Sequence, residues 1–297
     1  MTVAGLTRRY LIAGAGGMLG TALQRVLTER GIAFTAPPES EFDITSPASV
    51  DLVVSAFATE CLAVADQCVL VNAAAYTNVE RAEDDPETAY RVNEHGARML
   101  AIAARNAGLK FVHVSTDFVF DGAKDGAYAE SDPVNPLSVY GASKLAGEVA
   151  VAEADPDAIV ARTAWVFGEG GVNFPVKILE LAASRPKLSV VTDEIGSPTY
   201  TYDLATALVG LVEARATGLF HLAGSGSCSR FELAAEVLRL AGLPTEMDPV
   251  TSDAFPTKAA RPANSVLDCS KAAALGVTMS DWRDSLARFM AGRRAMA

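Results

Sequence analysis

The chain has 297 residues, of which 50% are hydrophobic, and a formal net charge of -11 at pH 7. This length allows one large domain, or a large domain with a smaller one, around a sizeable core. The acidic excess disfavours a nucleic-acid-binding protein or a protein of anionic membrane surfaces, because both need clustered Lys and Arg. No apolar run reaches about 18 residues, the length that a membrane span needs. We therefore expect neither nucleic acid nor membrane as a partner.

An apolar run at residues 10–13 is followed by a glycine-rich turn and then by a helical pattern at residues 18–30. Gly14, Gly17 and Gly20 have the spacing G-x-x-G-x-x-G. Such a turn lets the backbone approach a pyrophosphate, while the helix N-terminus supplies N–H donors and the positive end of its dipole. A glycine-rich turn can also be only a turn. Its position between a strand and a helix favours a dinucleotide site.

A second strand is predicted at residues 32–36, where NAD-preferring folds often place an acidic residue for the ribose hydroxyls. Here the strand ends in two prolines, and Glu39, Glu41 and Asp43 come later. These are either solvated loop charges or, for Asp43, a contact to the adenine end of the cofactor. The absent acidic residue favours NADPH, with NADH as the alternative, although no Arg for a 2'-phosphate is present there either.

Ser46 and Pro47 are typical of the N-cap and first position of a helix. A buried strand is predicted at residues 69–71, and small residues follow it, including Ala73 and Ala74. Small side chains at a strand end would let a ribose and a nicotinamide lie close to the backbone.

A long helix is predicted at residues 86–106, after an Asp-Pro start. Asn93 lies within it and is a candidate for shaping the active site by hydrogen bonding. We interpret His95 as an ordinary residue of the helix surface.

The next strand, predicted at residues 111–114, is followed closely by Thr116 and later by a helix that contains Tyr140 and Lys144. Residues four apart lie on one face of a helix, so the phenol and the ammonium come together. A nearby positive charge favours the phenolate and lowers a tyrosine pKa from about 10. With Thr116 as a second hydroxyl for the same oxygen, these residues outline a carbonyl-reducing site. Such a Tyr-Lys pair also arises by chance, so the upstream glycine-rich turn is its independent support.

Strands and helices continue to alternate as far as a strand at residues 159–161. This predicts an α/β fold, a Rossmann-like doubly wound parallel sheet with ligands at the strand C-termini. Beyond it we predict helices and strands at residues 174–184, 188–191, 219–222, 231–240 and 282–290, with an irregular, proline-marked region at 244–262. We assign residues 1–167 to an NAD(P)-binding domain. Residues 168–297 are mainly a smaller C-terminal substrate-binding lobe, from which about 201–222 return to the main sheet.

Neither a C-x-x-C motif nor a metal-ligand spacing connects the cysteines, which are Cys61, Cys68, Cys228 and Cys269. We expect them to be reduced and mostly buried, and we expect no metal site. Arg8 and Arg9 before an apolar run superficially resemble a twin-arginine export signal. That run leads directly into the glycine-rich motif, so its removal would destroy the fold. We therefore expect a cytoplasmic protein.

Six segments carry a family resemblance: GAGGMLG at Gly14, VNAAAYTNVERAE at Val71, STDFVFDG at Ser115, VYGASKLAGE at Val139, RTAWVFG at Arg162 and ARPANSVLD at Ala260. Together they resemble the extended short-chain dehydrogenase/reductase family and, within it, the dTDP-4-dehydrorhamnose reductases. The resemblance covers about residues 11–286. The glycine-rich turn and Tyr-x-x-x-Lys occur across the superfamily, whereas the third, fifth and sixth segments are much narrower.

The resemblance implies an NAD(P)H-dependent oxidoreductase that reduces C4 of a dTDP-linked 4-keto-6-deoxy sugar by hydride transfer. Tyr140 would protonate the resulting oxyanion, Lys144 would hold the nicotinamide ribose and lower the Tyr140 pKa, and Thr116 would hydrogen-bond the carbonyl oxygen. The implied cofactor contacts are Gly14, Gly17, Met18, Leu19, Gly20, Asp43, Ala73, Ala74, Tyr140 and Lys144. The implied sugar contacts are Asp117, Phe118, Trp165, Asn173 and Arg261. Plain core packing is the alternative for Trp165.

Several alternatives stay open. Many family members have Tyr where this chain has Phe118, so a 4-ketoreductase for another nucleotide deoxysugar is one alternative. A dehydratase is disfavoured because its Thr is typically followed by Asp and Glu, whereas Asp117 and Phe118 follow here. A 4-epimerase is less favoured because the narrower segments point elsewhere. A non-catalytic subunit similar to the regulator of methionine adenosyltransferase would need no Thr116, Tyr140 and Lys144 set. A homodimer also stays open.

Overall fold

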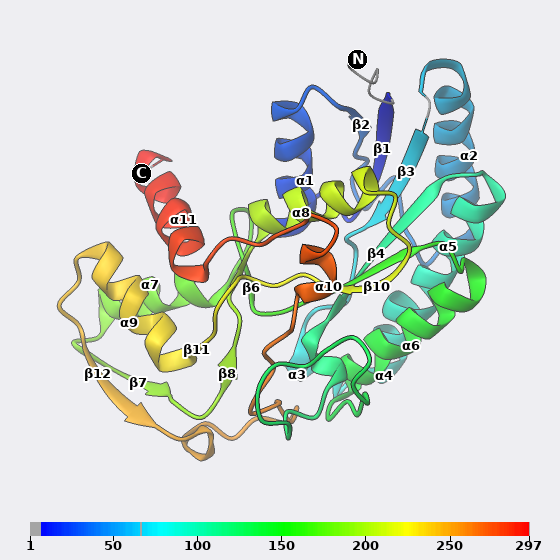
Figure 1. Ribbon diagram of the computed structural model, residues 1–297. Helices are drawn as coiled ribbons and strands as arrows, with labels where there is room; N and C mark the ends of the chain where they lie inside the picture. The colour runs from blue at the N-terminus through cyan, green and yellow to red at the C-terminus, as the bar shows by residue number, and fades with distance from the viewer. Residues whose placement is uncertain (1–6, 66, 297) are drawn as a thin grey trace.

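A parallel sheet forms the centre of the molecule (Figure 1). The computed structural model describes residues 7–65 and 67–296, so residues 1–6, 66 and 297 of the two predicted units lie outside it. Six strands pair in the order β10-β5-β4-β3-β1-β2, and every neighbouring pair is parallel. They are β1 Arg8–Ala13, β2 Ala33–Thr35, β3 Gln67–Asn72, β4 Lys110–Thr116, β5 Ile159–Thr163 and β10 Gly218–His221. The predicted doubly wound parallel sheet is confirmed.

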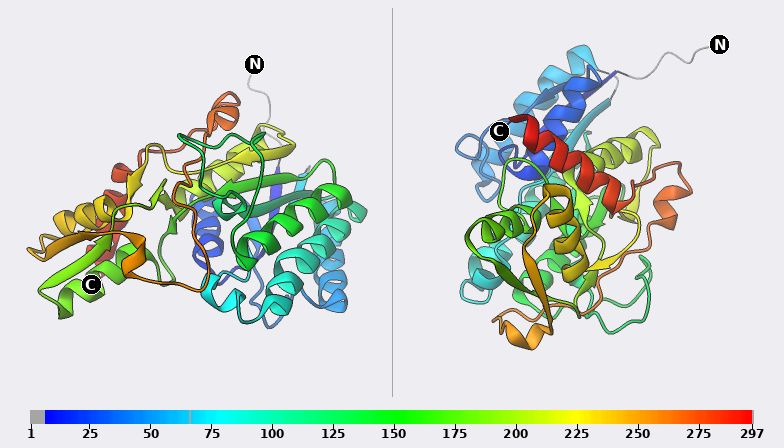
Figure 2. Two further views of the ribbon diagram at one scale, coloured as in Figure 1. Left: turned by 90° about the horizontal axis from the view of Figure 1, so that it is seen from below. Right: turned by 90° about the vertical axis from the view of Figure 1, so that its left-hand side faces the viewer.

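Helices cover both faces of this sheet (Figures 1 and 2). One face carries α1 Met18–Glu29 and α8 Thr201–Glu213, and the other carries α2 Pro47–Val64, α5 Ala97–Asn106 and α6 Val139–Ala154. Leu23 and Leu208 pack in the first interface, and Phe57 and Leu100 pack in the second. Each such side chain contributes roughly 1.5–3 kcal/mol through burial. Within the described ranges, none of the helices is long and apolar enough to cross a membrane.

The helix predicted at residues 86–106 is divided by a wide turn. It consists of α4 Pro86–Tyr90, the π-helical segment η1 Arg91–Gly96 and α5. The turn carries Asn93 into a buried position, where its side-chain oxygen accepts from the Tyr76 N–H at 2.9 Å and its amide donates to Ser143 Oγ at 2.9 Å. Such π-turns occur frequently at functional sites. His95 lies on the exposed surface, as predicted.

A smaller group of elements lies beside the sheet, on the left in Figure 1. It includes β6 Val166–Phe167, α7 Phe174–Ser184, β7 Lys187–Val191, β8 Ile195–Gly196, β9 Thr199–Tyr200, β11 Cys228–Ser229, α9 Arg230–Ala241, β12 Glu246–Val250 and α11 Trp282–Met296. Phe167, Trp282 and Phe289 are in its own core. The remaining short helices are α3 Val79–Ala82, η2 Asp117–Val119, η3 Ser252–Ala254 and α10 Ser270–Ala273. The predicted division at residue 167 stays a prediction.

Strand β12 corrects one expectation. The region at 244–262 is not irregular throughout, because β12 pairs in parallel with β7 over its whole length. Pro249 lies inside this strand. The pair forms a two-stranded sheet, so β12 has an edge at which the missing N–H of a proline is tolerated.

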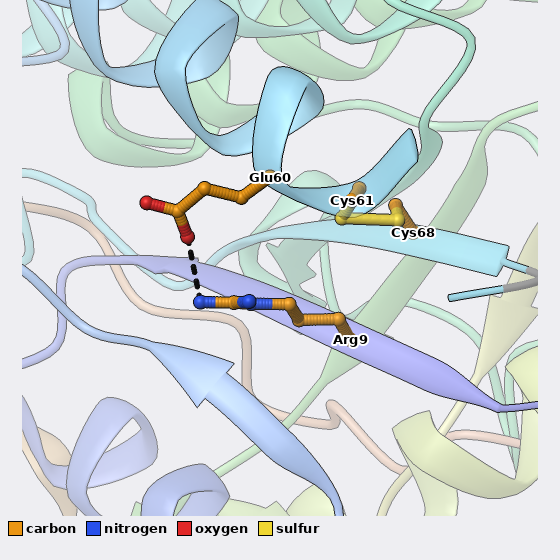
Figure 3. Close-up of a disulfide and its surroundings, with 4 residues drawn as sticks. All are labelled: Arg9, Glu60, Cys61 and Cys68. Atoms are coloured by element: carbon orange, nitrogen blue, oxygen red, sulfur yellow. Dashed lines mark hydrogen bonds and ion pairs between the residues drawn. A yellow bond between two sulfur atoms is a disulfide. The ribbon is translucent and has the colours of Figure 1, made fainter. Parts of the chain in front are cut away.

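A disulfide joins Cys61, near the end of α2, to Cys68 in β3 (Figure 3). The expectation of reduced cysteines is therefore wrong for this pair, whereas Cys228 and Cys269 are free. The end of α2 and the start of β3 approach each other so that the two Cα atoms lie 6.1 Å apart, which no sequence spacing reveals. Arg9 of β1 makes an ion pair of 2.6 Å with the neighbouring Glu60. Both links lie toward the amino ends of the strands.

Candidate active site

A large pocket opens at the carboxyl ends of the parallel strands. Its volume is about 1500 Å³, whereas pockets for a single small ligand typically measure about 300–1,000 Å³. The turns after β1, β3 and β4 form one wall, and Trp165, Phe174 and Arg230 contribute the opposite wall. Open α/β sheets bind ligands at this edge. The pocket therefore has room for a cofactor and a second ligand.

The glycine-rich turn between β1 and α1 is shaped by three different requirements. Gly14 has a φ of +77°, and a Cβ atom there would lie 2.5 Å from the Ala74 nitrogen. A Cβ atom on Gly20 would collide with the Gly14 carbonyl oxygen. A Cβ atom on Gly17 would meet only that oxygen, at an ordinary contact distance of 3.4 Å. Gly17 lines the pocket and is the N-cap of α1, where no side chain caps the N–H groups. This turn fits a dinucleotide diphosphate, which accepts hydrogen bonds from such groups.

The other predicted cofactor residues lie around the same pocket. Its lining includes Gly14, Gly17, Met18, Leu19, Asp43, Ala73, Ala74, Tyr140 and Lys144. Gly20 is not in the lining, because it packs beneath the turn. The Asp43 carboxylate accepts from both the N–H and the hydroxyl of Thr45 at 2.8 Å. Asp43 therefore also orders its own loop.

Thr116, Tyr140 and Lys144 come together on the floor of the pocket. Thr116 ends β4, and the other two lie on one face of α6. The start of α6 approaches η2 closely, because a Cβ atom on Gly141 would collide with the Phe118 carbonyl oxygen. The Phe118 ring contacts Tyr140 edge to face, with centroids 5.5 Å apart. The predicted trio is thus assembled from a strand end and a helix face.

The burial of this site controls its protonation. Burial raises the pKa of Tyr140 to about 12, a hydrogen bond with Thr116 opposes this, and the Asp117 charge adds to it. Burial also lowers the pKa of Lys144 to about 8, against the attraction of Glu148. The Tyr140 pKa thus moves opposite to the predicted direction, because burial and the Asp117 charge raise it and only the hydrogen bond with Thr116 lowers it. At neutral pH the phenol carries its proton.

Asp117 is buried at the edge of the floor, with 2% of its surface exposed. Burial raises its pKa to about 6, against hydrogen bonds with Ser265 and Thr116 and the charge of Arg230. One of its oxygens accepts from the Thr116 hydroxyl at 2.9 Å. At neutral pH this carboxyl is largely ionised, so it can accept a hydrogen bond from a sugar hydroxyl.

Trp165 and Arg230 form the wall opposite the sheet. Trp165 has a left-handed backbone, with φ +47°, and its indole N–H donates to Ser265 Oγ at 3.1 Å. The Arg230 guanidinium lies over the indole, 3.4 Å from the ring centroid, and its Nε donates to Glu194 at 3.3 Å. Sequence reasoning missed Arg230, whose position at the first turn of α9 gives no sign that the helix starts against the pocket.

The remaining predicted sugar contacts behave differently. Phe118 and Arg261 line the pocket, and Arg261 makes an ion pair of 3.1 Å with Glu80. Asn173 is not in the lining: its side chain caps α7 by accepting from the Val176 N–H at 3.2 Å. It therefore has a structural role as the cap of α7, and its predicted sugar contact stays a prediction. Among the described residues, no group of three or more His, Cys, Asp or Glu side chains is placed to hold a metal ion.

Known proteins resemble the whole chain. A dTDP-4-dehydrorhamnose reductase of Mycobacterium tuberculosis is 40% identical over 97% of this chain and 94% of its own length. A dTDP-4-keto-6-deoxy-D-glucose reductase of Streptomyces niveus is 40% identical over 88% of this chain and 89% of its own. The solved structure of a Bacillus anthracis dTDP-4-dehydrorhamnose reductase in complex with NADP is 35% identical, with a TM-score of 0.90, over 96% of this chain and 99% of that one.

These similarities extend across the sheet, the pocket and the smaller lobe alike. The family model described as RmlD substrate binding domain matches residues 8–294. That range includes every residue of the site and both walls of the pocket. The chain therefore belongs to the RmlD substrate binding domain family.

Proposed function

We propose that the protein is an NADPH-dependent reductase of the 4-keto group of a dTDP-linked 4-keto-6-deoxy sugar, and that it converts dTDP-4-dehydro-L-rhamnose to dTDP-L-rhamnose. The observation that carries the proposal is the meeting of Thr116, Tyr140 and Lys144 beside the glycine-rich turn in one pocket. The names of relatives that match almost the whole chain support it. NADH is the alternative cofactor.

The protein's residues divide the chemistry between binding and proton transfer. Reduced nicotinamide, when bound, supplies the hydride to C4 of the sugar. The turn at Gly14 and Gly17 holds the cofactor diphosphate, and Lys144 holds the nicotinamide ribose. The Tyr140 phenol gives its proton to the C4 oxygen, which Thr116 also hydrogen-bonds. Lys144 stabilises the phenolate that remains, since an opposite charge nearby favours the ionised form.

The smaller-lobe wall suits an anionic nucleotide sugar. A chain of net charge -11 must hold a diphosphate with local cations, and Arg230 and Arg261 both line the pocket on this side. We assign the diphosphate to them, and the sugar ring to Asp117, Phe118 and Trp165. A guanidinium suits this role because its planar set of donors matches phosphate oxygens.

A second substrate is favoured by one specific residue. Phe118 brings no hydroxyl to the sugar site, where the family resemblance described above leads us to expect Tyr. The Streptomyces niveus relative is named a dTDP-4-keto-6-deoxy-D-glucose reductase. Reduction of that diastereomer of the sugar is therefore the second candidate.

The assay follows oxidation of NADPH and NADH in parallel by the purified protein. The sugar is made in situ from dTDP-glucose by a 4,6-dehydratase, with or without the epimerase that follows it. Oxidation that depends on the epimerase, with dTDP-rhamnose as product, supports the proposal. Oxidation without the epimerase supports the second candidate. Tight cofactor binding without oxidation would instead favour the regulatory alternative, which predicts a stoichiometric partner enzyme.

We extend the proposal to location and assembly. A nucleotide sugar and reduced nicotinamide are metabolites of the cytoplasm, which is where we place the protein. We also propose a homodimer, which light scattering on the purified protein tests directly.

A further inference from the structure

The helix face that carries the proposed catalytic residues continues to a buried acid. Glu148 lies four residues after Lys144 in α6, with 6% of its surface exposed. Arg162 of β5, 3% exposed, donates to both of its oxygens, from Nε at 2.9 Å and from Nη2 at 2.7 Å. Ser115 of β4 donates to the same carboxylate at 2.5 Å. Glu148 therefore ties α6 to the two strands whose ends form the pocket floor.

This geometry leaves Lys144 outside the ion pair between Glu148 and Arg162. A Lys and a Glu four residues apart on a helix ordinarily attract each other into an ion pair. Here the carboxylate is held by Arg162 in a two-point contact, the strongest arrangement for this pair of groups. The Lys144 ammonium instead donates to the Val114 carbonyl oxygen at 2.6 Å, at the pocket lining.

The surroundings contribute little further charge. His113 of β4 faces Lys144, and burial is the main reason why its pKa lies well below the usual value. His221 of β10 faces Arg162, and burial lowers its pKa as well. Both imidazoles are therefore neutral near pH 7. Lys144, Glu148 and Arg162 thus form a buried trio with one excess positive charge.

Two carboxylates lie at the borders of this trio. Glu130 accepts from the backbone N–H of His221 at 2.9 Å, on the side away from the pocket. Asp117 acts on Tyr140 from the pocket side and raises the pKa of that phenol. Neither of them takes the place of Glu148 beside Lys144.

We propose that Arg162 is a positioning residue: by occupying Glu148, it prevents that carboxylate from pairing with Lys144 and so leaves the ammonium to the pocket. The part of the test that measures turnover rests on the proposed reductase function. The consequence is specific, because Arg162 matters only while Glu148 carries its charge.

Substitution of Arg162 and substitution of Glu148 should therefore change turnover and its pH profile in different ways. In Arg162→Met, Glu148 loses its partner and draws Lys144, so we expect turnover to fall about 10²-fold, in the range of a lost acid-base contribution. The alkaline limb of the pH profile should move to higher pH, because a closer carboxylate favours the charged ammonium. In Glu148→Gln the attraction is lost, so that limb should move to lower pH, with turnover below pH 7 within a few-fold of wild type.

The experiment measures kcat against pH for wild type, both variants and the double variant. NADPH binding, followed by its fluorescence over the same pH range, gives a readout that does not need the sugar. Opposite displacement of the two limbs supports the proposal. Equal losses with unmoved limbs would show a merely structural ion pair and overturn it. Arg239→Met is the matched control, because Arg239 makes a two-point contact with Glu236 on the exposed surface.

The double variant covers the case in which either single variant does not fold, since each of them leaves one charge of the buried pair without its partner, and that is strongly destabilising. With Gln at position 148, no carboxylate remains for Lys144 to follow. The double variant should then match Glu148→Gln in both turnover and limb position. A double variant that loses turnover where Glu148→Gln keeps it would refute the assigned role of Arg162. If wild type binds NADPH but reduces no sugar, the pH dependence of NADPH binding by the variants still tests the role of Arg162.

Discussion

Replacing Lys144 by methionine is expected to stabilise the folded protein at neutral pH while removing turnover. Burial is the main reason why the pKa of Lys144 falls from 10.5 to about 8. At about 1.4 kcal/mol per pKa unit, holding this side chain charged costs roughly 3 kcal/mol. Methionine fills a similar volume, but it leaves the Val114 carbonyl without its donor, a loss of about 1 kcal/mol. The expected net gain is about 2 kcal/mol.

The pH dependence gives the sharper test. The folded pKa of Lys144 lies below its unfolded value, so the unfolded chain binds the proton more strongly between about pH 8 and 10.5. Wild-type stability therefore rises through this window from this group, and the variant lacks that rise. The stability difference should be largest below pH 8 and should close toward pH 10.5.

Urea unfolding at pH 7, 9 and 10 measures this difference. Lys187→Met is the control, because Lys187 pairs with Asp248 at 2.7 Å on the surface, and this pairing raises the Lys187 pKa. A Lys144→Met protein that is less stable than wild type at pH 7 would refute the reasoning. So would a stability difference that does not change with pH, since that would trace the effect to packing.

Three further predictions concern separate parts of the molecule. Tyr140→Phe should fold and bind cofactor but lose turnover about 10²- to 10⁴-fold; near-wild-type turnover would remove Tyr140 from its proposed role. Gly17→Val should weaken NADPH binding in calorimetry with an unchanged circular dichroism spectrum, because a Cβ atom there meets only the Gly14 oxygen and Gly17 lines the pocket. Unchanged affinity would count against this turn as the diphosphate site. Cys61→Ser should lower unfolding free energy by at most about 2.5 kcal/mol, the chain-entropy value for so short a loop, with turnover intact, and added reductant should then change only the wild-type melt. A loss of turnover would contradict the placement of the bridge away from the pocket.

Local patterns were sufficient for most of the framework. Ser46 is the N-cap of α2, as predicted, with its hydroxyl accepting from the Ser49 N–H at 3.4 Å. The glycine-rich turn needs Gly14 for its positive φ and Gly20 for close packing, which are properties of the residue types themselves. Such features depend on a few neighbours in the chain, so a sequence can specify them.

Features made by distant segments were missed. Arg230 reaches the pocket only because α9 begins beside Trp165, which is far away in sequence. The sequence shows that Glu148 lies four residues after Lys144 in a helix. It does not show that Arg162 pairs with Glu148, because that contact results from the packing of α6 on β5. The Cys61 bridge depends likewise on how closely the end of α2 approaches β3.

The Tyr140 pKa shows the same limit in energetic terms. A sequence reveals that a lysine lies one helical turn away, and Coulomb attraction alone then lowers the tyrosine pKa. It does not reveal that the phenol is buried or that Asp117 lies close, and both raise that pKa. Burial is set by the whole fold, so the sign of the shift was decided by residues that local spacing does not contain.

The site therefore holds several charges that folding disfavours, and their arrangement explains why they are kept. Burial opposes the charged forms of both Asp117 and Lys144, yet both residues line the pocket beside the same phenol. Asp117 favours the protonated Tyr140, which is the form needed before proton transfer, and Lys144 would favour the phenolate that follows it. Arg162 prevents Glu148 from cancelling the second of these effects. These buried charges therefore lower the stability of the folded protein. Functionally, they keep the Tyr140 phenol protonated before proton transfer and stabilise its phenolate afterwards.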